Sequence, residues 1–374
     1  MKIGVDIRLL ARGVQSGVEE YTLNLLPRLF GFREVEFKLF YNAFKKNKLD
    51  FPWASFQNVK IIQRSIPNRF LQFSSFLFNF PKIDKMIGGV DSFFSPHFIL
   101  SPTSKKCRKI ITFHDLSFEY YPEFFSFSRN LWHKLMRPKK QAQEADIIIS
   151  VSESTKDDLI NLYKIDPNKI KVIYPGVGDE FKKMDLAETL KTKEKYKLPE
   201  KFILYFGTIE PRKNIDGIIK AFDLLKENLK SDIKLVIAGS PGWLYKDVFR
   251  AAKESKFEKD IIFMGFIEKK DKPSLYNLAS LFVYPSYFEG FGFPPLEAMA
   301  CGVPTIVSNC TSLPEVAGQG ALLVNPYNIN ELFVVMKEVL TNKSLSDDLA
   351  NRGLSQAKKF NWDSCAKETL KIIS

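Results

Sequence analysis

The stretch YFEGFGFPPLEAMACG, residues 287–302, is the part of the chain from which the fold is most readily inferred. The short apolar run before it, Leu281–Pro285, is typical of a buried strand. The pair Pro294–Pro295 followed by LEAMA predicts a helix start, because proline is tolerated in the first turn. A strand, a glycine loop and a helix N-terminus in series form an anion site, since backbone N–H groups and the helix dipole point at the loop.

Two carboxylates bracket this loop, Glu289 and Glu297, and no lysine or arginine lies within the stretch. Phosphate alone is therefore not the expected ligand. Carboxylates accept hydrogen bonds from hydroxyl groups, and glycines let a ligand approach the backbone closely. The combination predicts a polyhydroxylated ligand that also carries phosphate, which describes a nucleotide-sugar.

The spacing of Glu289 and Glu297, with seven residues between them, resembles the signature of retaining glycosyltransferases of the GT-B fold. The surrounding EGFGFPPLEAMACG is similar to glycosyltransferase family four, and within it to the bacterial mannosyltransferase-like members. The resemblance implies that Glu297 accepts hydrogen bonds from the donor's ribose and Glu289 from its sugar. It also implies that Gly290, Phe291 and Gly292 lie against the donor.

Length and composition fit this interpretation. A chain of 374 residues predicts two domains, and 45% hydrophobic residues supply ample core. The four cysteines have no metal-site or C-x-x-C spacing, which favours a reduced cytoplasmic protein, and three histidines argue against a multi-histidine metal centre. No run approaches the roughly 20 apolar residues of a membrane span.

Strands and helices alternate along both halves, which predicts parallel, doubly wound α/β sheets. The expected strands are Lys2–Leu9, Phe37–Tyr41, Val59–Ile62, Ser92–Ser95, Ile110–Phe113, Ile147–Ser152 and Val172–Tyr174, then Phe202–Phe206, Lys234–Ala238, Ile261–Met264, Leu281–Tyr284 and Thr305–Ser308. The expected fold is GT-B, with two Rossmann-like domains facing a cleft. We place an acceptor-binding domain at residues 1–180 and a nucleotide-sugar-binding domain at 181–360. The helix within 361–374 is expected to pack back on the first domain.

The segment FGTIEPRKN, residues 206–214, puts Arg212 and Lys213 at the carboxyl end of an expected strand. A guanidinium forks onto phosphate oxygens and an ammonium adds a compact charge. The segment is similar to the G-x-x-x-x-R-K-N pattern of the family, which adds Gly207 to the site. The two cations are expected to neutralise a departing diphosphate without a metal; a solvated basic loop is the alternative.

The loop GVQSG, Gly13–Gly17, follows the first expected strand and opens a helix. It resembles the family's N-terminal glycine loop, which approaches the donor phosphates and the acceptor. The family form is usually richer in glycine, and we carry over Gly17 with the donor site. The loop is not a G-x-G-x-x-G, so it gives little support to a dinucleotide fingerprint.

Other strand ends supply further candidates through the same resemblance. His114, in FHDLSFEYYPEFFS, lies where the mannosyltransferase-like branch has a histidine near the transferred sugar. Gly239 and the pair Phe266–Ile267 lie where the family lines the nucleotide, with the base beside the second strand end. A structural histidine and ordinary strand-to-helix turns are the alternatives.

The expected reaction is retaining transfer of a hexose, α-mannose from GDP-mannose, onto a glycan or lipid-linked glycan. No cofactor or metal is expected besides the donor. A UDP-sugar-dependent transferase and a GT-B phosphorylase or epimerase remain alternatives, whereas a nucleic-acid-binding protein is disfavoured because no readable motif is present. The acceptor, the linkage, the donor base and the oligomeric state do not follow from the sequence.

Positive charge is concentrated in the first half, where residues 1–180 hold 27 Lys and Arg against 19 Asp and Glu. Large apolar side chains beside basic residues suit a membrane surface, and the stretch Phe124–Lys140 fits this as well as it fits a core. For the run Phe70–Phe80 we expect core. The resulting location is cytoplasmic, with peripheral contact at the inner membrane surface as a possibility to test.

Overall fold

The computed structural model describes residues 1–12, 17–43 and 51–374. The chain divides into two compact units. Unit 1 comprises Met1–Leu116, Phe127–Gly176 and Asn361–Ser374, and unit 2 comprises Ser117–Ser126 and Val177–Phe360. The division after Gly176 falls four residues before the expected boundary at 180. The segment Ser117–Ser126, which we expected in the first domain, belongs to unit 2.

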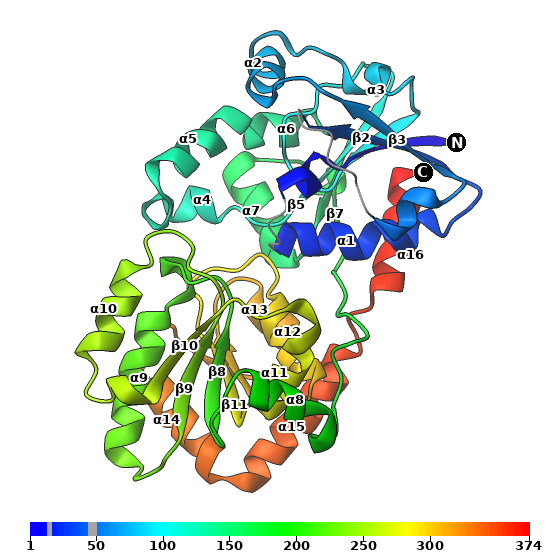
Figure 1. Cartoon of the computed structure of the whole chain (residues 1–374). Coiled ribbons are helices and arrows are strands. Elements are labelled where there is room, and N and C mark those ends of the chain that lie inside the picture. Colours follow the sequence, from blue (N-terminus) through cyan, green and yellow to red (C-terminus); the bar gives the residue numbers. More distant parts are fainter. Residues whose placement is uncertain (13–16, 44–50) are drawn as a thin grey trace. The chain divides into compact units, whose positions relative to one another are not determined.

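Unit 1 is built on a parallel seven-stranded sheet with the order β3-β2-β1-β4-β5-β6-β7 (Figure 1). Its strands are β1 (Lys2–Asp6), β2 (Glu36–Asn42), β3 (Val59–Arg64), β4 (Ser92–Ser95), β5 (Arg108–Phe113), β6 (Ile147–Ser150) and β7 (Ile170–Val172). Its helices are α1 (Gly17–Phe30), α2 (Asn68–Phe78), α3 (Ile83–Met86), α5 (Phe127–Met136), α6 (Pro138–Glu144), α7 (Glu153–Tyr163) and α16 (Trp362–Ile373).

Unit 2 has a parallel six-stranded sheet with the order β10-β9-β8-β11-β12-β13. Its strands are β8 (Phe202–Phe206), β9 (Lys234–Ala238), β10 (Ile261–Gly265), β11 (Leu281–Tyr284), β12 (Thr305–Ser308) and β13 (Leu322–Val324). Its helices are α4 (Ser117–Tyr120), α8 (Leu186–Lys195), α9 (Ile215–Asn228), α10 (Lys246–Glu254), α11 (Lys272–Leu278), α12 (Phe293–Ala300), α13 (Leu313–Ala317), α14 (Ile329–Thr341) and α15 (Lys343–Ala357). Helices α9, α10 and α14 lie on one side of this sheet and α11, α12 and α15 on the other (Figure 1).

The prediction of two doubly wound parallel sheets is confirmed. Central strands such as β11 are buried along their whole length, as expected for strands covered on both faces. Strand β13 was not among the expected strands, and β7 spans Ile170–Val172 rather than the expected Val172–Tyr174. Strand β1 ends at Asp6, before the expected Leu9, since the Asp6 carboxylate accepts hydrogen bonds from the backbone and guanidinium of Arg8 and turns the chain.

The helix α16 packs on α1 within unit 1, and the two lie side by side in Figure 1. The ring of Trp362 lies edge-on to that of Tyr21 with centroids 5.8 Å apart. Arg28 Nε donates to Asp363 Oδ1 at 2.9 Å, and Ser92 Oγ donates to the Ile373 carbonyl at 2.5 Å. Aromatic packing and polar contacts at both ends of the helix therefore fix this late segment to the sheet of unit 1.

The run Phe70–Phe80 does not form core, so that expectation is wrong. Helix α2 buries Leu71, Ser74 and Ser75 and leaves most of its phenylalanines exposed. The described residues 1–12, 17–43 and 51–374 contain no helix that combines the length and the apolar character of a membrane span.

Three glycines end adjacent strands of unit 2 and bring the backbones together there. The N–H of Gly207, after β8, donates to the Ala238 carbonyl at 3.0 Å, and the N–H of Gly239, after β9, donates to the Gly265 carbonyl at 2.8 Å. At Gly239 φ is +136°, and a Cβ would lie 1.9 Å from the Gly207 carbonyl oxygen. Only glycine fits this close approach.

Replacing Gly239 by alanine should therefore destabilise unit 2 by about 3 kcal/mol or more, through overpacking and backbone strain together. The matched control is Gly265→Ala, where φ is +68° but a Cβ would meet nothing within 4 Å. The control should cost only about 1–2 kcal/mol. Urea unfolding of both variants measures the difference, and equal losses would contradict the close approach described here.

Candidate functional site

The strand order of unit 2 reverses between β8 and β11, and this is where open α/β sheets bind ligands, at the carboxyl ends of the strands. Lys213 follows β8 and Glu289 follows β11. Lys213 Nζ donates to Glu289 Oε1 at 2.5 Å and to the Tyr284 hydroxyl at 2.6 Å. The two loops at the reversal are therefore joined by a buried ion pair between residues that the sequence had singled out separately.

Arg212 lies beside this pair and is held from two loops. Its Nη1 donates to the Phe288 carbonyl at 2.7 Å and to Glu289 Oε2 at 3.1 Å. Its Nη2 donates to Glu210 Oε1 at 2.7 Å. The guanidinium is thus fixed in orientation by a carbonyl and two carboxylates, which leaves little freedom to lose when a ligand binds.

The cluster contains two cations, Arg212 and Lys213, and two carboxylates, Glu289 and Glu210. Glu210 is buried like its neighbours and pairs with Arg212. Burial disfavours the charged form of Glu289, but the charges of Arg212 and Lys213 prevail and lower its pKa to about 2. Burial and the neighbouring Arg212 lower the pKa of Lys213, while Glu289 opposes that shift. The carboxylate is therefore ionised at neutral pH, and it partly offsets the positive charge that a diphosphate would meet.

Asn214, the residue after Lys213, connects the loops next to the cluster through its side chain. It has a left-handed backbone, φ 55°, at the start of α9, and its Nδ2 donates to the carbonyls of Pro285 and Pro326 at 3.1 and 2.7 Å. Its Oδ1 accepts from the Tyr287 hydroxyl at 2.9 Å. A single asparagine thereby connects three loops, which explains why the R-K-N segment needs its third residue.

The glycine loop is pinned from the next strand end. Ser312 Oγ donates to the carbonyls of Glu289 and Phe291 at 2.9 and 3.0 Å, and Thr311 Oγ1 accepts from the Glu289 N–H at 3.0 Å. The side chain of Phe291 is buried against Phe293, 5.2 Å between ring centroids. Any contact of Phe291 with a ligand is thus through its backbone, and its expected place among the donor contacts stays a prediction.

Helix α12 begins directly after Gly292, which caps it with φ +107°. The expectation that N–H groups of this helix start bind an anion stays a prediction, with fewer donors than a helix start usually offers. Pro294 and Pro295 occupy the first turn and carry no N–H, so two of the donors are missing. What this helix end offers is chiefly its dipole.

Glu297, on the first turns of α12, is buried and held from α11. Lys272 Nζ donates to its Oε1 at 2.8 Å, and the Tyr276 hydroxyl donates to its Oε2 at 2.7 Å. The ammonium of Lys272 also lies over the rings of Phe181 and Phe206, 5.2 and 5.1 Å from their centroids. Glu297 is therefore fixed in place by side chains of its own unit, separately from the cluster around Glu289.

Phe266 and Ile267 follow β10, and their side chains differ sharply. Phe266 is 73% exposed, whereas Ile267 is buried. An exposed ring next to the glycine-ended strands is a suitable stacking platform for a nucleobase. Ile267 belongs to the core, so any contact it makes with a ligand is through its backbone.

The remaining candidates lie in unit 1. His114 follows β5; its Nε2 lies 2.7 Å from the Pro96 carbonyl and its ring is edge-on to Tyr21, 4.9 Å between centroids. Burial lowers the pKa of His114, although the Pro96 carbonyl and Asp115 oppose this. Gly17 begins α1, and residues 13–16 of the glycine loop lie outside the described residues.

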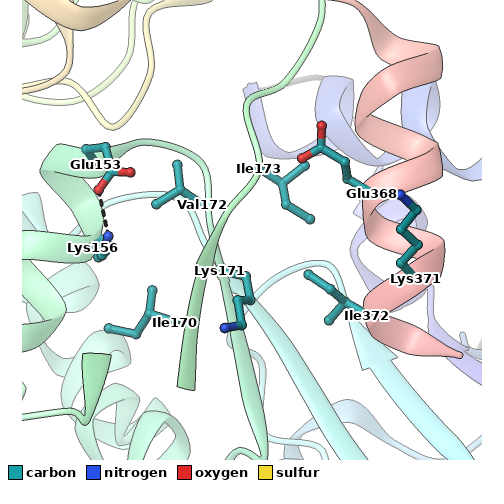
Figure 2. A pocket seen from close by; sticks show the side chains of 9 residues that line it. All are labelled: Glu153, Lys156, Ile170, Lys171, Val172, Ile173, Glu368, Lys371 and Ile372. Carbon is teal, nitrogen blue, oxygen red and sulfur yellow. Dashed lines mark hydrogen bonds and ion pairs between the residues drawn. The ribbon is translucent and has the colours of Figure 1, made fainter. Parts of the chain in front are cut away.

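A cavity of about 370 Å³ lies elsewhere in unit 1, along the edge strand β7 (Figure 2). It is lined by side chains from α7, β7 and α16, among them Lys171 and the ion pair Lys156–Glu153. None of the residues predicted from the sequence lines it. Charged side chains beside an open strand edge discourage pairing with another chain, which is sufficient reason for their presence here.

Four contacts of the site were missed by the sequence analysis: those of Glu210, Tyr284, Lys272 and Tyr276. Glu210 lies two residues before Arg212 and Tyr284 ends an expected strand, so their positions gave a signal. Lys272 and Tyr276 gave none, since only the packing of α11 on α12 brings them to Glu297. Within the described parts of the chain, His, Cys, Asp and Glu side chains nowhere gather in threes as a metal ligand set requires.

Two glycosyltransferase family models match this chain. The model of Glycosyltransferase Family 4 matches residues 15–181, and that of Glycosyl transferases group 1 matches residues 187–356. The chain is 31% identical to O-antigen chain mannosyltransferase B of Escherichia coli over 374 aligned residues, which cover 95% of each protein. It is 36% identical to the serotype-specific mannosyltransferase WbdA of Escherichia coli over 263 residues, 69% of this chain and 32% of that protein.

Solved structures with little sequence identity share the whole fold. Sucrose-phosphate synthase from Thermosynechococcus elongatus superposes with a TM-score of 0.80 at 20% identity, over 100% of this chain and 98% of the other. WaaG, a glycosyltransferase involved in lipopolysaccharide biosynthesis, has a TM-score of 0.74 at 16% identity over 100% of both chains. The GT-B fold is therefore confirmed.

The depressed pKa of Glu289 predicts an acid-dependent stability. Its folded pKa of about 2 lies below the ordinary 4.5, so its contribution is complete above about pH 4.5 and is lost as the pH falls toward 2. The full contribution is on the order of 3 kcal/mol. In urea unfolding, the gap in unfolding free energy between wild type and Glu289→Gln should be constant from pH 7 to 5 and narrow below about pH 4.5.

The control for this comparison is Glu254→Gln, an exposed carboxylate on α10 of the same unit. Its stability should follow that of the wild type at every pH. A gap for Glu289→Gln that stays constant, or widens, in acid would show that Glu289 is not held ionised by its two cations.

Proposed function

Because the chain belongs to glycosyltransferase family 4, we propose that it transfers α-mannose from GDP-mannose to a growing glycan, with retention of the anomeric configuration and without a metal ion. The observation that carries the proposal is the buried cluster of Arg212, Lys213 and Glu289 at the strand reversal of unit 2. That cluster combines phosphate-binding cations with a hydroxyl-binding carboxylate.

Mannose is favoured as the transferred sugar by the relatives. The E. coli proteins similar to this chain over 95% and 69% of its length are both called mannosyltransferases. The names of these relatives specify no donor base, and GDP is inferred from the mannosyltransferase-like resemblance of the sequence. A UDP-sugar is the competing donor, and the assays below are run with both.

The donor is held by the second buried carboxylate and by the glycine-ended strands. Glu297 accepts the ribose hydroxyls, and Lys272 keeps the carboxylate oriented for them. The exposed ring of Phe266 stacks on the base. Gly207 and Gly239 have no side chain, so the phosphates can approach the backbone at this edge of the sheet.

Transfer is electrostatic in this scheme. The bond from the anomeric carbon to the diphosphate oxygen breaks, and the acceptor oxygen forms its bond on the same face of the sugar. The proton of the acceptor hydroxyl passes to the departing phosphate oxygen. Arg212 and Lys213 stabilise the charge that develops on the diphosphate, while Glu289 orients the sugar hydroxyls, and such preorganised charges often supply the largest catalytic term.

The acceptor is proposed to be a lipid-linked or otherwise anionic glycan presented at a membrane, with peripheral contact by unit 1. Residues 1–180 carry a balance of +8, from 27 basic and 19 acidic residues. Clustered basic residues are attracted to anionic lipid surfaces. His114 of unit 1 is proposed to bind the transferred sugar, and its lowered pKa keeps it a neutral hydrogen-bonding group.

Lys213→Ala should reduce turnover by about 10²-fold or more, because one preorganised cation facing the diphosphate is lost. The assay is release of nucleoside diphosphate from GDP-mannose, and in parallel from UDP-sugars, with an α-mannosyl oligosaccharide as acceptor. Lys220→Ala, an exposed lysine on α9, is the matched control, and melting temperatures show whether each variant is folded. Full activity of Lys213→Ala, or strict dependence of the wild type on a divalent ion, would contradict the assigned role.

Glu297→Gln and Glu289→Gln should differ in what they bind. Titration calorimetry with GDP alone should show weaker binding for Glu297→Gln, because its proposed partner is the ribose. Binding of GDP to Glu289→Gln should stay close to that of the wild type while transfer falls, because its proposed partner is the sugar. Equal losses of GDP binding in the two variants would show that Glu297 and Glu289 do not bind the ribose and the sugar separately.

A further inference from the structure

Helix α2 has the reverse of the usual arrangement of side chains. A surface helix normally buries its apolar stripe and exposes polar residues. Here the buried positions are Leu71, Ser74 and Ser75, and Ser74 Oγ donates to the Phe80 carbonyl at 2.7 Å. From Phe70 on, the exposed positions of the helix are large and apolar, each between 51% and 71% exposed: Phe70, Phe73, Leu77, Phe78 and, just beyond the helix, Phe80.

Helix α5 exposes a second apolar stripe. Phe127, Leu131 and Leu135 are 84%, 46% and 42% exposed, and their spacing of four residues places them on one face of the helix. The opposite face is used for packing, since Trp132 lies against Phe98 with ring centroids 6.1 Å apart. The exposed stripe is therefore not the side by which α5 is held on unit 1.

Arg137, directly after α5, joins the two helices. Its guanidinium carbon lies 3.7 Å from the ring centroid of Phe76 in α2, and its Nη1 donates to the Phe76 carbonyl at 3.2 Å. We call the exposed apolar residues of the two helices, with Phe80, the α2–α5 surface. Large exposed apolar areas mark sites of interaction with a partner or a membrane.

The two sequence segments that form this surface carry side-chain charge of one sign. No aspartate or glutamate occurs from Ser65 to Ile83 or from Phe124 to Gln143. The same two segments hold seven basic residues: Arg69, Lys82, Arg129, Lys134, Arg137, Lys139 and Lys140. The Nζ of Lys140 lies 3.6 Å from Glu144 Oε1, so the charge of this lysine is partly neutralised. A second copy of the chain would oppose like charges here, whereas an anionic lipid surface would be complementary.

We propose that α2 and α5 form the surface by which the protein lies on an anionic lipid bilayer. The exposed phenylalanines and leucines enter the boundary between headgroups and acyl chains, and the basic residues face the lipid phosphates. This is the geometry of interfacial helices, which lie in the membrane plane with the apolar face shallowly buried. The inference rests on the proposed function only in assuming that the acceptor is presented at a membrane.

Co-sedimentation of the full chain with vesicles tests the proposal, without donor or acceptor. The vesicles are phosphatidylcholine alone or mixed with phosphatidylglycerol, at low and high salt. Wild type should bind the anionic vesicles and lose binding with salt. The apolar variant Phe70→Ser/Phe73→Ser/Leu77→Ser should bind at least about tenfold less. The charge variant Arg129→Gln/Lys134→Gln/Lys139→Gln should lose about tenfold or more and most of its salt dependence.

Matched variants on unit 2 control for loss of apolar area and charge as such. Leu190→Ser/Leu323→Ser/Val334→Ser removes three exposed apolar residues, and Lys246→Gln/Lys253→Gln/Lys259→Gln removes three exposed charges. Both should bind vesicles as the wild type does. A Phe73→Trp variant should shift its fluorescence to the blue on adding anionic vesicles, and Val334→Trp should not.

The outcomes separate the two levels of the argument. If the wild type binds neither kind of vesicle, the membrane contact in the proposed function fails together with this surface. If the wild type binds but the α2 and charge variants bind equally well, the surface is wrong and the membrane contact stands. If instead the wild type is a dimer by size exclusion and the apolar variant a monomer, a second copy covers the surface and the proposal is overturned. None of these measurements depends on transfer activity.

Discussion

The site depends on one buried carboxylate that cannot remain unpaired. Taking the charge of Glu289 out of water is costly unless cations replace its hydration, and Lys213 and Arg212 do so from the neighbouring loop. The ion pair forces the loops after β8 and β11 together at the point where the strand order reverses. Removal of either partner leaves a buried charge, so the residues proposed to act on the donor also fix the local backbone.

The same principle of mutual fixation extends through the second unit. Glu297 is held by Lys272 and Tyr276, Asn214 ties three loops, and Ser312 and Thr311 hold the glycine loop. Each of these side chains has a hydrogen-bond partner within the protein, which places dipoles and charges before any ligand arrives. Such preorganisation reduces the reorganisation that binding or transfer would otherwise require.

The sequence predicted much of this and failed for identifiable reasons. Strand-forming runs, the seven-residue spacing of Glu289 and Glu297, and the Arg212–Lys213 pair are local patterns, and the sheets confirm the expected topology. The contact of Lys272 with Glu297 depends on how two helices pack, which no local pattern encodes. The Phe70–Phe80 run was assigned to the core because apolar side chains are usually buried. Hydrophobicity alone does not show whether the protein's own core or another surface covers them. The serines of this run carried the contrary signal, since they mark the inward face of α2.

Unit 1 is the first part of the chain to be synthesised and the last to be completed. Its sheet is encoded before Gly176, but α16, which covers α1, is encoded after all of unit 2. Unit 2 has all its residues once Phe360 has left the ribosome, because Ser117–Ser126 emerged earlier. On a growing chain, the face of α1 that packs on α16, Tyr21 included, therefore lacks this cover while unit 2 folds, until Asn361–Ser374 has been translated.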